Sequence, residues 1–522
     1  MTQVIIFTGS SRTDPKKFAD KTDSTFLMNR PLGAYQIASI LRDHGYTVQV
    51  IDRYHWMVRN KAEEFYKDVI RKYITKDTLW VGWSNTFFEG KSKLDNSEKN
   101  IGYITEAADA IGMEERGMAA MNRFRQFANP NIKFICGGAK TWRWSQQGLT
   151  FFDFYFEGYS DVMMLDFTNW LAGKGSKPPT RVLDTGAEVI NYDRKGDKFN
   201  FIEHVHKWHE SDYIEPGEAL PIEISRGCIF RCSYCSYPLN GKKKLDFIRE
   251  PEPLREELIK NYEEYGITQY YYSDDTHNDS VEKLEYLYDE IYSKLPFKIQ
   301  FATYLRLDLL GAHPQTIPLL KESGLVGTFF GIESFNNAAN KSVGKGATEA
   351  RIYENLWKCK EIWKDQVHIQ AGLIVGLPHD DEESVMDWGL RAVSKDSPLD
   401  SASITELHLF PNYSKDKHWL NQMELNPDLY GYTFDKEGIN WTNNKGLSKK
   451  RSQEISEILK KELHKNKWGN RIHPKSWYSF AHATNLKLET EDYLNTPEED
   501  LIARRDRLLN EYFIKLKNGA PQ

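Results

Sequence analysis

The chain has 522 residues, of which 40% are hydrophobic and 28% charged, with a net charge of −6 at pH 7. These values are ordinary for a globular protein of two to four domains, and the acidic balance gives no bulk electrostatic attraction to nucleic acid. No apolar run reaches the ~18 residues of a transmembrane helix. The N-terminus has neither a basic region nor a cleavage site, so we expect a cytoplasmic protein without membrane partners.

The first 176 residues alternate strand and helix patterns. Short apolar runs predict strands at residues 4–8, 47–51, 79–83, 132–136 and 154–156. Apolar residues at helical spacing predict a helix over residues 34–44, which Gly45 ends. This alternation predicts a Rossmann-like, doubly wound parallel sheet that binds ligands at the carboxyl ends of its strands.

Residues 177–219 are predicted to be a connector. They open on Lys177-Pro178-Pro179 and are polar with little periodicity. His204, His206 and His209 within them are expected to be exposed connector residues.

Three of the five cysteines, Cys228, Cys232 and Cys235, directly follow a strand pattern that contains Ile222 and Ile224. A disulfide framework would spread an even number of cysteines through a short secreted chain, which excludes that interpretation. A structural zinc site takes four ligands, so zinc would need one histidine in addition. The candidates for that ligand are His204, His206, His209 and His277. A cubane cluster on three thiolates would leave one iron open for chemistry.

The stretch Cys228-Ile-Phe-Arg-Cys232-Ser-Tyr234-Cys235 resembles the cluster loop of the radical S-adenosylmethionine (SAM) superfamily. In that family the open iron chelates the amino and carboxylate groups of SAM, and reduction of the cluster cleaves the sulfonium to a 5′-deoxyadenosyl radical. The resemblance implies a 4Fe-4S cluster on the three catalytic cysteines, with Tyr234 packed beside the adenine. It also implies an electron donor such as flavodoxin or ferredoxin.

Further strands are predicted at residues 268–272, 298–304, 326–331, 367–375 and 403–410, with helical patterns between them. Six strand–helix units predict a partial (β/α)6 TIM-type barrel over residues 220–410, which is also the fold that the resemblance implies. Barrels of this kind place their chemistry at the carboxyl ends of the strands. Residues 411–522 are predicted to be a helical C-terminal region, with amphipathic helices at 448–466 and 496–517.

Polar residues follow the second and third strands of this barrel. Ser273, Asp274 and Asp275 lie where the family contacts the SAM amino group, and carboxylate and hydroxyl oxygens are suitable acceptors. Arg306 follows the third strand, and its forked guanidinium suits the SAM carboxylate. Two structural interpretations stay open: the aspartates cap the next helix or turn, and Arg306 pairs with Asp308.

The fourth and fifth strands end in further matches to the family. Glu333 and Ser334 resemble the motif whose side chains reach the ribose or methionine end of SAM, although Glu333 is also placed to cap a helix. Gly376 lies where the family's backbone meets adenine, and glycine allows close backbone approach to a ligand. Lys341, Lys345 and Gly346 resemble a family segment to which no role is assigned.

The front region carries a second resemblance. Gly45-x-x-Val48-x-Val50-x-Asp52, Val81-Gly-x-Ser84, Gly137-Gly138 and Asp153-x3-Glu157-Gly158 resemble the cobalamin-binding domain that precedes many radical SAM domains. That family has an Asp-x-His-x-x-Gly motif whose histidine binds cobalt, but the loop between residues 9 and 33 contains no histidine. The resemblance therefore implies either cobalamin without a lower histidine ligand or no cobalamin.

These observations predict a radical SAM enzyme, with cobalamin-dependent methylation of a carbon or phosphorus centre as the leading hypothesis. A cobalamin-independent rearrangement, oxidation or sulfur insertion is the alternative reaction. A non-catalytic zinc- or cluster-binding regulatory protein is the alternative of another class. A small molecule or peptide is favoured over nucleic acid as the substrate.

Overall fold

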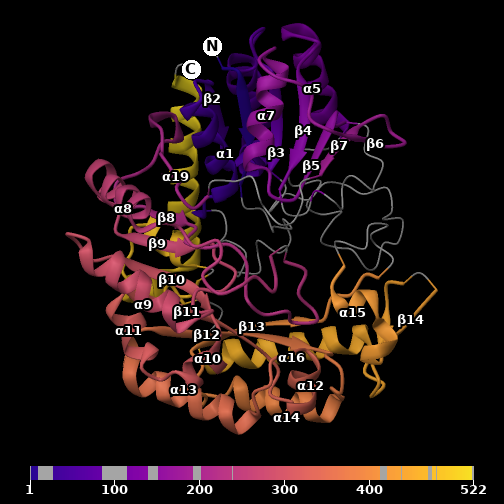
Figure 1. Ribbon diagram of the computed structural model, residues 1–522, viewed down its shortest axis with the longest axis vertical. Helices are drawn as coiled ribbons and strands as arrows, with labels where there is room; N and C mark the ends of the chain where they lie inside the picture. Colours follow the sequence, from indigo (N-terminus) through magenta and orange to yellow (C-terminus); the bar gives the residue numbers. More distant parts are fainter. Residues whose placement is uncertain are drawn as a thin grey trace. The chain divides into compact units, whose positions relative to one another are not determined.

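The computed structural model describes residues 2–9, 28–84, 115–138, 141, 151–191, 201–237, 239–411, 420–436, 438–467, 473–477 and 479–519, without the side chains of residues 55, 59 and 115–120. The chain divides into two compact units (Figure 1). The first unit is Met1–Pro221 together with Thr496–Gln522, and the second is Ile222–Asn495.

A seven-stranded sheet forms the middle of the first unit, in the order β2-β1-β3-β4-β5-β7-β6. Its strands are β1 (Val4–Phe7), β2 (Val48–Ile51), β3 (Trp80–Ser84), β4 (Lys133–Gly137), β5 (Phe154–Glu157), β6 (Arg181–Val182) and β7 (Glu188–Asn191). All neighbours pair in parallel except β6 and β7, which are antiparallel. The predicted doubly wound parallel sheet is confirmed.

Helices cover both faces of this sheet because alternate strand residues point to opposite sides. On one face lie α1 (Leu32–Asp43) and α7 (Asp161–Leu171), side by side in Figure 1; the Trp80 Nε1 atom of β3 donates to Thr168 of α7 at 3.0 Å. On the other face, Val81 and Trp83 of β3 join a buried apolar cluster. That cluster is completed by α2 (Tyr54–Glu64), the π-helical η2 (Phe65–Ile70), α5 (Glu115–Ala128) and α19 (Glu498–Asn518).

Two segments of the first unit differ from expectation. Residues 177–219, expected to be a connector, contribute β6 and β7 to the sheet. The last helix, α19, was expected to belong to the C-terminal region, but it packs Leu509, Phe513 and Leu516 into the core of the first unit. An amphipathic pattern identifies the apolar face of a helix but not the surface that covers it, so the sequence could not assign α19.

The second unit contains a six-stranded sheet in the order β13-β12-β11-β10-β9-β8. Its strands are β8 (Ala219–Ile222), which contains the boundary between the two units, β9 (Gln269–Tyr272), β10 (Gln300–Leu305), β11 (Leu325–Glu333), β12 (His368–Val375) and β13 (Ser401–Glu406). The pairs from β9 to β13 are parallel. Sequential strand order confirms the predicted partial barrel, and each strand lies within a few residues of its predicted position.

The helices between these strands are α8 (Pro251–Tyr265), α9 (Val281–Glu290), α11 (Thr316–Glu322), α13 (Glu349–Trp363) and α14 (Glu382–Ala392). They cover the apolar strands from outside, which is why β12 is buried along nearly its whole length. Further along the chain, α16 (Lys449–Asn466) matches the amphipathic helix predicted at residues 448–466, and its N-cap is Ser448, whose side chain accepts from the Arg451 N–H. Glycine at position 389 of α14 lets Leu459 of α16 approach closely, since a Cβ there would lie 2.6 Å from Leu459 Cδ1.

Among the helices that the structure describes, none combines the length and apolar character needed to cross a membrane.

Candidate active site

The cysteine loop, residues 225–242, leaves β8 and folds back beside its own start. The Cys228 N–H donates to Leu239 O at 3.3 Å, and the Gly241 N–H donates to Cys228 O at 2.7 Å. Gly227 adopts a left-handed φ of +80°, and a Cβ atom there would lie 2.5 Å from the Leu239 Cβ. Only glycine fits this turn, which fixes the first cysteine at the end of the strand.

Each of the three thiols accepts a hydrogen bond from a neighbouring side chain. The pairs are Thr276 Oγ1 to Cys228 Sγ (3.3 Å), Arg306 Nη1 to Cys232 Sγ (3.5 Å) and Asn240 Nδ2 to Cys235 Sγ (3.1 Å). Donors aimed at ligating sulfur stabilise negative charge on it and tune the potential of an iron–sulfur group. The donor set therefore fits a sulfur-bound, anionic cofactor.

The protonation of the thiols also bears on ligand binding. Burial raises the pKa of Cys228 above its ordinary range and that of Cys235 to about 11, so both thiols are protonated at neutral pH until a metal displaces the protons. No three His, Cys, Asp or Glu side chains in the described ranges come together as they would around one metal ion. His277, one of the candidate zinc ligands, is fully buried and makes edge contacts with the stacked rings of Tyr272 and Phe301.

Asp274 fixes the start of the cysteine loop through hydrogen bonds to its backbone and to one side chain. Its Oδ1 accepts the backbone N–H groups of Ile224 (2.7 Å) and Ser225 (3.1 Å), and its Oδ2 accepts the Ser225 hydroxyl (2.9 Å). Burial alone would raise the pKa of Asp274, but the neighbouring His277, whose Nδ1 lies 3.7 Å from Asp274 Oδ2, and the charge of Lys283 hold that pKa below its ordinary value. The expected contact with the SAM amino group differs from this geometry, because the carboxylate oxygens are already used within the protein.

Asp275 has the same supporting position. Its Oδ2 accepts the Gly227 N–H at 3.0 Å, and burial raises the pKa of the carboxyl to about 6. Ser273, by contrast, has an exposed side chain at the end of β9. Of the three residues after β9, Ser273 is the one that is exposed.

Arg306 lies against the cysteine loop with its fork already filled. Its Nε and Nη2 donate to the two Asp308 oxygens at 3.0 and 2.6 Å. The guanidinium carbon is 3.6 Å from the centroid of the Phe230 ring, a cation–π contact. The ion pair with Asp308, the alternative that the sequence left open, is therefore formed, and the third nitrogen reaches Cys232.

Glu333 lies at the end of β11 and is held by two side chains. The Tyr234 hydroxyl donates to Glu333 Oε1 at 2.6 Å, and Lys345 Nζ lies 3.2 Å from the same oxygen. Burial, followed by the adjacent Glu333 carboxylate, raises the pKa of Tyr234 far above its ordinary value, so the hydroxyl remains a donor. The structure thus brings Tyr234 and Glu333 together and adds Lys345 to them.

Ser334 and Gly376 are engaged within the protein. Ser334 is fully buried, and its hydroxyl accepts the Asn336 N–H at 3.0 Å. The Gly376 N–H donates to Asp380 at 3.2 Å and its carbonyl accepts from Tyr432 at 2.8 Å. A Cβ at position 376 would lie 2.3 Å from the Trp441 ring, so the close approach that requires glycine here is that of Trp441.

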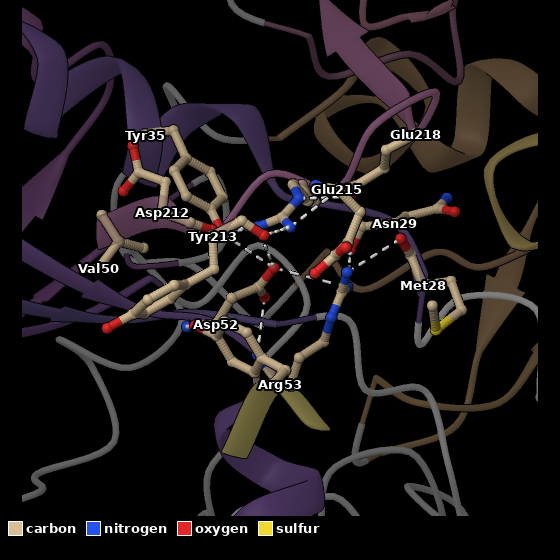
Figure 2. Close-up of polar contacts among 12 residues, drawn as sticks. Met28, Asn29, Tyr35, Val50, Asp52, Arg53, Asp212, Tyr213, Glu215 and Glu218 are labelled. Carbon is tan, nitrogen blue, oxygen red and sulfur yellow. Dashed lines mark hydrogen bonds and ion pairs between the residues drawn. The ribbon is translucent and has the colours of Figure 1, made fainter. Parts of the chain in front are cut away.

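The carboxyl edge of the front sheet holds a buried charge cluster at the end of β2, in the first unit (Figure 2). Arg30 donates to Glu218 through Nε (2.5 Å) and Nη2 (3.0 Å), and to the Tyr35 hydroxyl at 2.8 Å. Tyr35 in turn donates to Asp52 at 3.0 Å. Burial would raise the pKa of Glu218, but Arg30 holds it below the ordinary value, so the pair is ionised.

Arg53 completes this charge cluster. It donates to the carbonyls of Asn29 (2.7 Å) and Met28 (3.1 Å), and its backbone N–H donates to Asp52 at 2.7 Å (Figure 2). The two arginines balance the two carboxylates, Asp52 and Glu218. This corner of the sheet is neutral overall and its charges are satisfied internally.

Elsewhere on the carboxyl edge of the front sheet, glycines follow the strands. Gly138 after β4 and Gly158 after β5 adopt positive φ values of +110° and +93°. Backbone without side chains admits close approach by a large ligand, which fits cobalamin. None of the described side chains that directly follow β1 to β5 is a histidine; most of the loop between residues 9 and 33 and the His55 side chain lie outside the described parts.

Sequence reasoning did not find the side chains that serve the thiols. Thr276 stands two residues beyond Asp274 at the same strand end, so the strand-end rule could have included it. Asn240 and Phe230 lie in the cysteine loop without any periodic signal. Lys345 was matched to a family segment but had no role until its distance to Glu333 was known.

Comparison with protein families matches residues 222–388 to the Radical SAM superfamily. An uncharacterized methyltransferase of Pyrococcus horikoshii is 27% identical over 227 residues, 42% of this chain and 48% of that protein. The anaerobic magnesium-protoporphyrin IX monomethyl ester cyclase of Cereibacter sphaeroides is 25% identical over 169 residues, 32% of this chain and 26% of that protein. The chain therefore spans about a quarter to a half of the length of these curated relatives.

Solved structures share the fold over most of the chain. The radical SAM methyltransferase TsrM of Kitasatospora setae, with tryptophan and a SAM analogue bound, gives a TM-score of 0.57 at 14% identity, covering 82% of this chain and 77% of that one. The cobalamin-dependent SAM radical enzyme OxsB, with aqua-cobalamin and SAM bound, gives 0.53 at 14% identity, covering 98% of this chain and 62% of that one. The resemblance to a radical SAM domain behind a cobalamin-binding-like domain is thereby confirmed at the level of fold.

Proposed function

Because residues 222–388 of this chain are a radical SAM domain, we propose that the protein is an enzyme that reductively cleaves SAM at a 4Fe-4S cluster held by Cys228, Cys232 and Cys235. We propose further that it binds cobalamin in the first unit and transfers a methyl group to a carbon or phosphorus centre. The observation that carries the proposal is the set of three thiols, each with its own hydrogen-bond donor, at the carboxyl edge of the family-matched barrel.

When bound, a 4Fe-4S cluster supplies the electron that cleaves the sulfonium of SAM. The chain's own part is to hold the three sulfurs and to stabilise their negative charge through Thr276, Arg306 and Asn240. Asp274 fixes the backbone at Ile224 and Ser225, and Asp275 fixes it at Gly227, so the start of the loop keeps its shape while the thiols change partners. A reductant such as flavodoxin or ferredoxin would deliver the electron.

SAM itself needs acceptors for its amino group and its ribose hydroxyls. Glu333 lies beside Lys345 and offers a carboxylate oxygen at the end of β11, and Ser273 offers an exposed hydroxyl at the end of β9. In this proposal Arg306 serves the sulfur of Cys232 rather than the SAM carboxylate, since Asp308 occupies its fork.

Cobalamin-dependent methyl transfer is supported by the fold of both units together. Structures of TsrM and OxsB with cobalamin bound match more than three quarters of this chain. The glycines after β4 and β5 fit a large ligand at the edge where doubly wound sheets bind cofactors. We propose that any cobalamin here lacks a lower histidine ligand.

A cobalamin-independent radical reaction is the second candidate. One of the two curated relatives is a cyclase rather than a methyltransferase, and its match falls at a similar level of identity. In either case we propose a small molecule or peptide as the substrate.

The reaction is tested by the products of SAM turnover. Anaerobically reconstituted protein is incubated with SAM and dithionite, with and without added cobalamin, and 5′-deoxyadenosine and S-adenosylhomocysteine are quantified. Cobalamin-dependent S-adenosylhomocysteine formation supports methyl transfer, whereas 5′-deoxyadenosine that is independent of cobalamin supports the second candidate. If iron is bound and neither product forms, the proposed activity is wrong and a regulatory role takes its place.

A further inference from the structure

We propose that Lys345 and the hydroxyl of Tyr234 are positioning residues that fix the Glu333 carboxylate by one oxygen and leave its other oxygen to accept a hydrogen bond from SAM. This inference rests on the proposed function and adds two roles to it. Tyr234 lies between two of the cysteines, so the same contact connects the SAM-binding strand directly to the cysteine loop.

The backbone at the end of β11 is shaped to present Glu333. The pairing of β11 with β12 shifts register between Gly331 and Glu333, a bulge that re-aims the side chains after it. Glu333 itself has a left-handed φ of +68°, which is uncommon for a residue other than glycine. Conformations of this kind persist where the surroundings hold them, and they gather at functional sites.

Two donors converge on one oxygen of this carboxylate. Oε1 accepts the Tyr234 hydroxyl at 2.6 Å and lies 3.2 Å from Lys345 Nζ. No hydrogen bond from any other described residue reaches Oε2, and 10% of the Glu333 side-chain surface is exposed. Glu333 is therefore held at one oxygen while the other is available to a donor from a ligand.

Lys345 is fixed independently of the carboxylate. Its Nζ also donates to Gly331 O at 2.8 Å, two residues before Glu333 on the same strand. Glycine at position 331 is needed for this arrangement, because a Cβ there would lie 2.7 Å from Glu333 Oε1 and 3.0 Å from Lys345 Nζ. The lysine is thus anchored to the strand before it reaches the glutamate.

The segment that carries Lys345 also packs on the cysteine loop. The Ser233 N–H donates to Val343 O at 3.3 Å, and a Cβ at Gly344 would lie 3.8 Å from the Cys232 Cα. The loop, the bulged end of β11 and residues 342–345 therefore meet around Glu333. A change in any one of them is expected to move the carboxylate relative to the cysteines.

The test compares Tyr234→Phe and Lys345→Met with wild type in the reconstituted full chain. We expect each variant to keep its iron content and to bind SAM about tenfold more weakly, about 1.4 kcal/mol, measured by SAM-induced changes in the electron paramagnetic resonance of the reduced cluster. Lys345→Arg keeps a cation with several donors and should retain affinity within about threefold.

Two matched variants control for loss of a hydroxyl or an ion pair elsewhere in the same unit. Tyr292→Phe removes a hydroxyl that lies 3.0 Å from the Tyr272 hydroxyl, and Lys360→Met removes the ion pair with Asp400 at the amino end of β13. Both should leave SAM affinity unchanged. If they weaken it as much as the site variants do, the effect is a general loss of stability and the inference is wrong.

A double-mutant cycle separates positioning of Glu333 from any other effect. In a Glu333→Ala background, Tyr234→Phe and Lys345→Met should weaken SAM binding no further, because the carboxylate that they position is gone. Independent effects of the same size in that background would overturn the inference. Methylthioadenosine, which lacks the amino group, shows which group of SAM donates to Glu333. If Tyr234→Phe and Lys345→Met weaken the binding of both ligands, the donor is the ribose. If they weaken the binding of SAM alone, the donor is the amino group.

The outcomes also separate this inference from the proposed function. Wild-type protein that binds iron but not SAM would overturn the proposed function itself. Wild-type protein that binds SAM, with Tyr234→Phe and Lys345→Met binding it equally well, would overturn the positioning roles and leave the proposed function standing.

Discussion

The carboxyl edges of the two sheets both carry buried charged side chains, but they satisfy them differently. At the end of β2, the two positive charges of Arg30 and Arg53 face the two negative charges of Asp52 and Glu218. The N–H groups of both arginines donate to neighbouring carboxylates and carbonyls. At the carboxyl ends of the barrel strands, one oxygen of Glu333 and the exposed Ser273 hydroxyl remain as acceptors, beside three thiols that accept from Thr276, Arg306 and Asn240. A charged side chain at a strand end therefore does not by itself indicate a binding site. A side chain that is fixed by the protein and still has an acceptor atom without a hydrogen bond is a better indication of one.

The comparison predicts that changes at the edge of the front sheet affect stability. It also predicts that changes at the edge of the barrel affect cofactor and SAM binding.

The largest effect is expected from deletion of residues 496–522. It removes Leu509, Phe513 and Leu516 from the core of the first unit, at about 1.5–3 kcal/mol for each buried side chain, which together approach the stability of a whole domain.

We expect limited proteolysis of this deletion variant to cut the first unit rapidly while the second unit stays resistant and still binds iron. Equal resistance of the first unit in the full chain and the deletion variant would show that α19 contributes no stability.

Breaking the charge cluster should have the next largest effect. Arg30→Met leaves Glu218 buried without its partner, which typically costs about 3–5 kcal/mol of unfolding free energy. The measurement is denaturant unfolding, with SAM affinity determined in parallel and expected to stay unchanged. Lys177→Met, which removes the partly exposed pair with Glu188, is the matched control and should cost at most about 1 kcal/mol.

A substitution of Asp274 is expected to affect both stability and cofactor binding moderately, because Asp274 is buried and also fixes the cysteine loop. Asp274→Asn removes the charge that faces Lys283 and disturbs the bonds to Ile224 and Ser225, at about 1–3 kcal/mol. We also expect slower iron incorporation, followed by absorbance during reconstitution. Unchanged stability and unchanged incorporation would place the support of the loop elsewhere.

The smallest effect is the acid dependence of the charge cluster. Arg30 holds the pKa of Glu218 below its ordinary value, so the folded state binds its proton less readily than the unfolded chain does. The stability that this pair contributes is then present above the ordinary pKa near 4.5 and is lost as the pH falls through the lower folded pKa.

Glu218→Gln should therefore be less stable than wild type at pH 7, and the difference should shrink at pH 3, measured by denaturant unfolding at each pH. A difference that stays constant with pH would mean that the glutamate acts through packing and not through its charge.

Much of the fold followed from the sequence, and less of the site did. Strand runs, the helix that Gly45 ends and the closely spaced cysteines are local signals, and the structure has these elements where they were expected. Arg30 pairs with Glu218, which lies 188 residues further along the sequence. The Tyr512 hydroxyl accepts the Asp52 N–H across a sequence separation of 460 residues. Contacts over such separations leave no periodic trace, so neither α19 nor residues 177–219 could be assigned to the first unit.

In the site, the strand-end rule pointed to Asp274, Arg306 and Glu333, but of their partners the sequence named only Asp308. Family resemblance gave all three a SAM contact, whereas the geometry turns Asp274 and Arg306 toward the cysteine loop. The sequence does not show that the Asp274 carboxylate accepts two backbone N–H groups or that the Arg306 guanidinium donates to Asp308. In the sequence, both side chains look the same as side chains that are available to a ligand. Of the carboxylates Asp274 and Glu333, only Glu333 has an oxygen that no hydrogen bond from a described residue reaches.

The most direct test of the central claim is metal analysis after anaerobic reconstitution with iron, sulfide and cobalamin, in wild type and in Cys232→Ala. A cubane cluster on the cysteine loop predicts about four iron atoms per chain in wild type and loss of that iron in the variant. Zinc in place of iron, or equal iron in both proteins, would contradict the assignment of Cys228, Cys232 and Cys235 as cluster ligands.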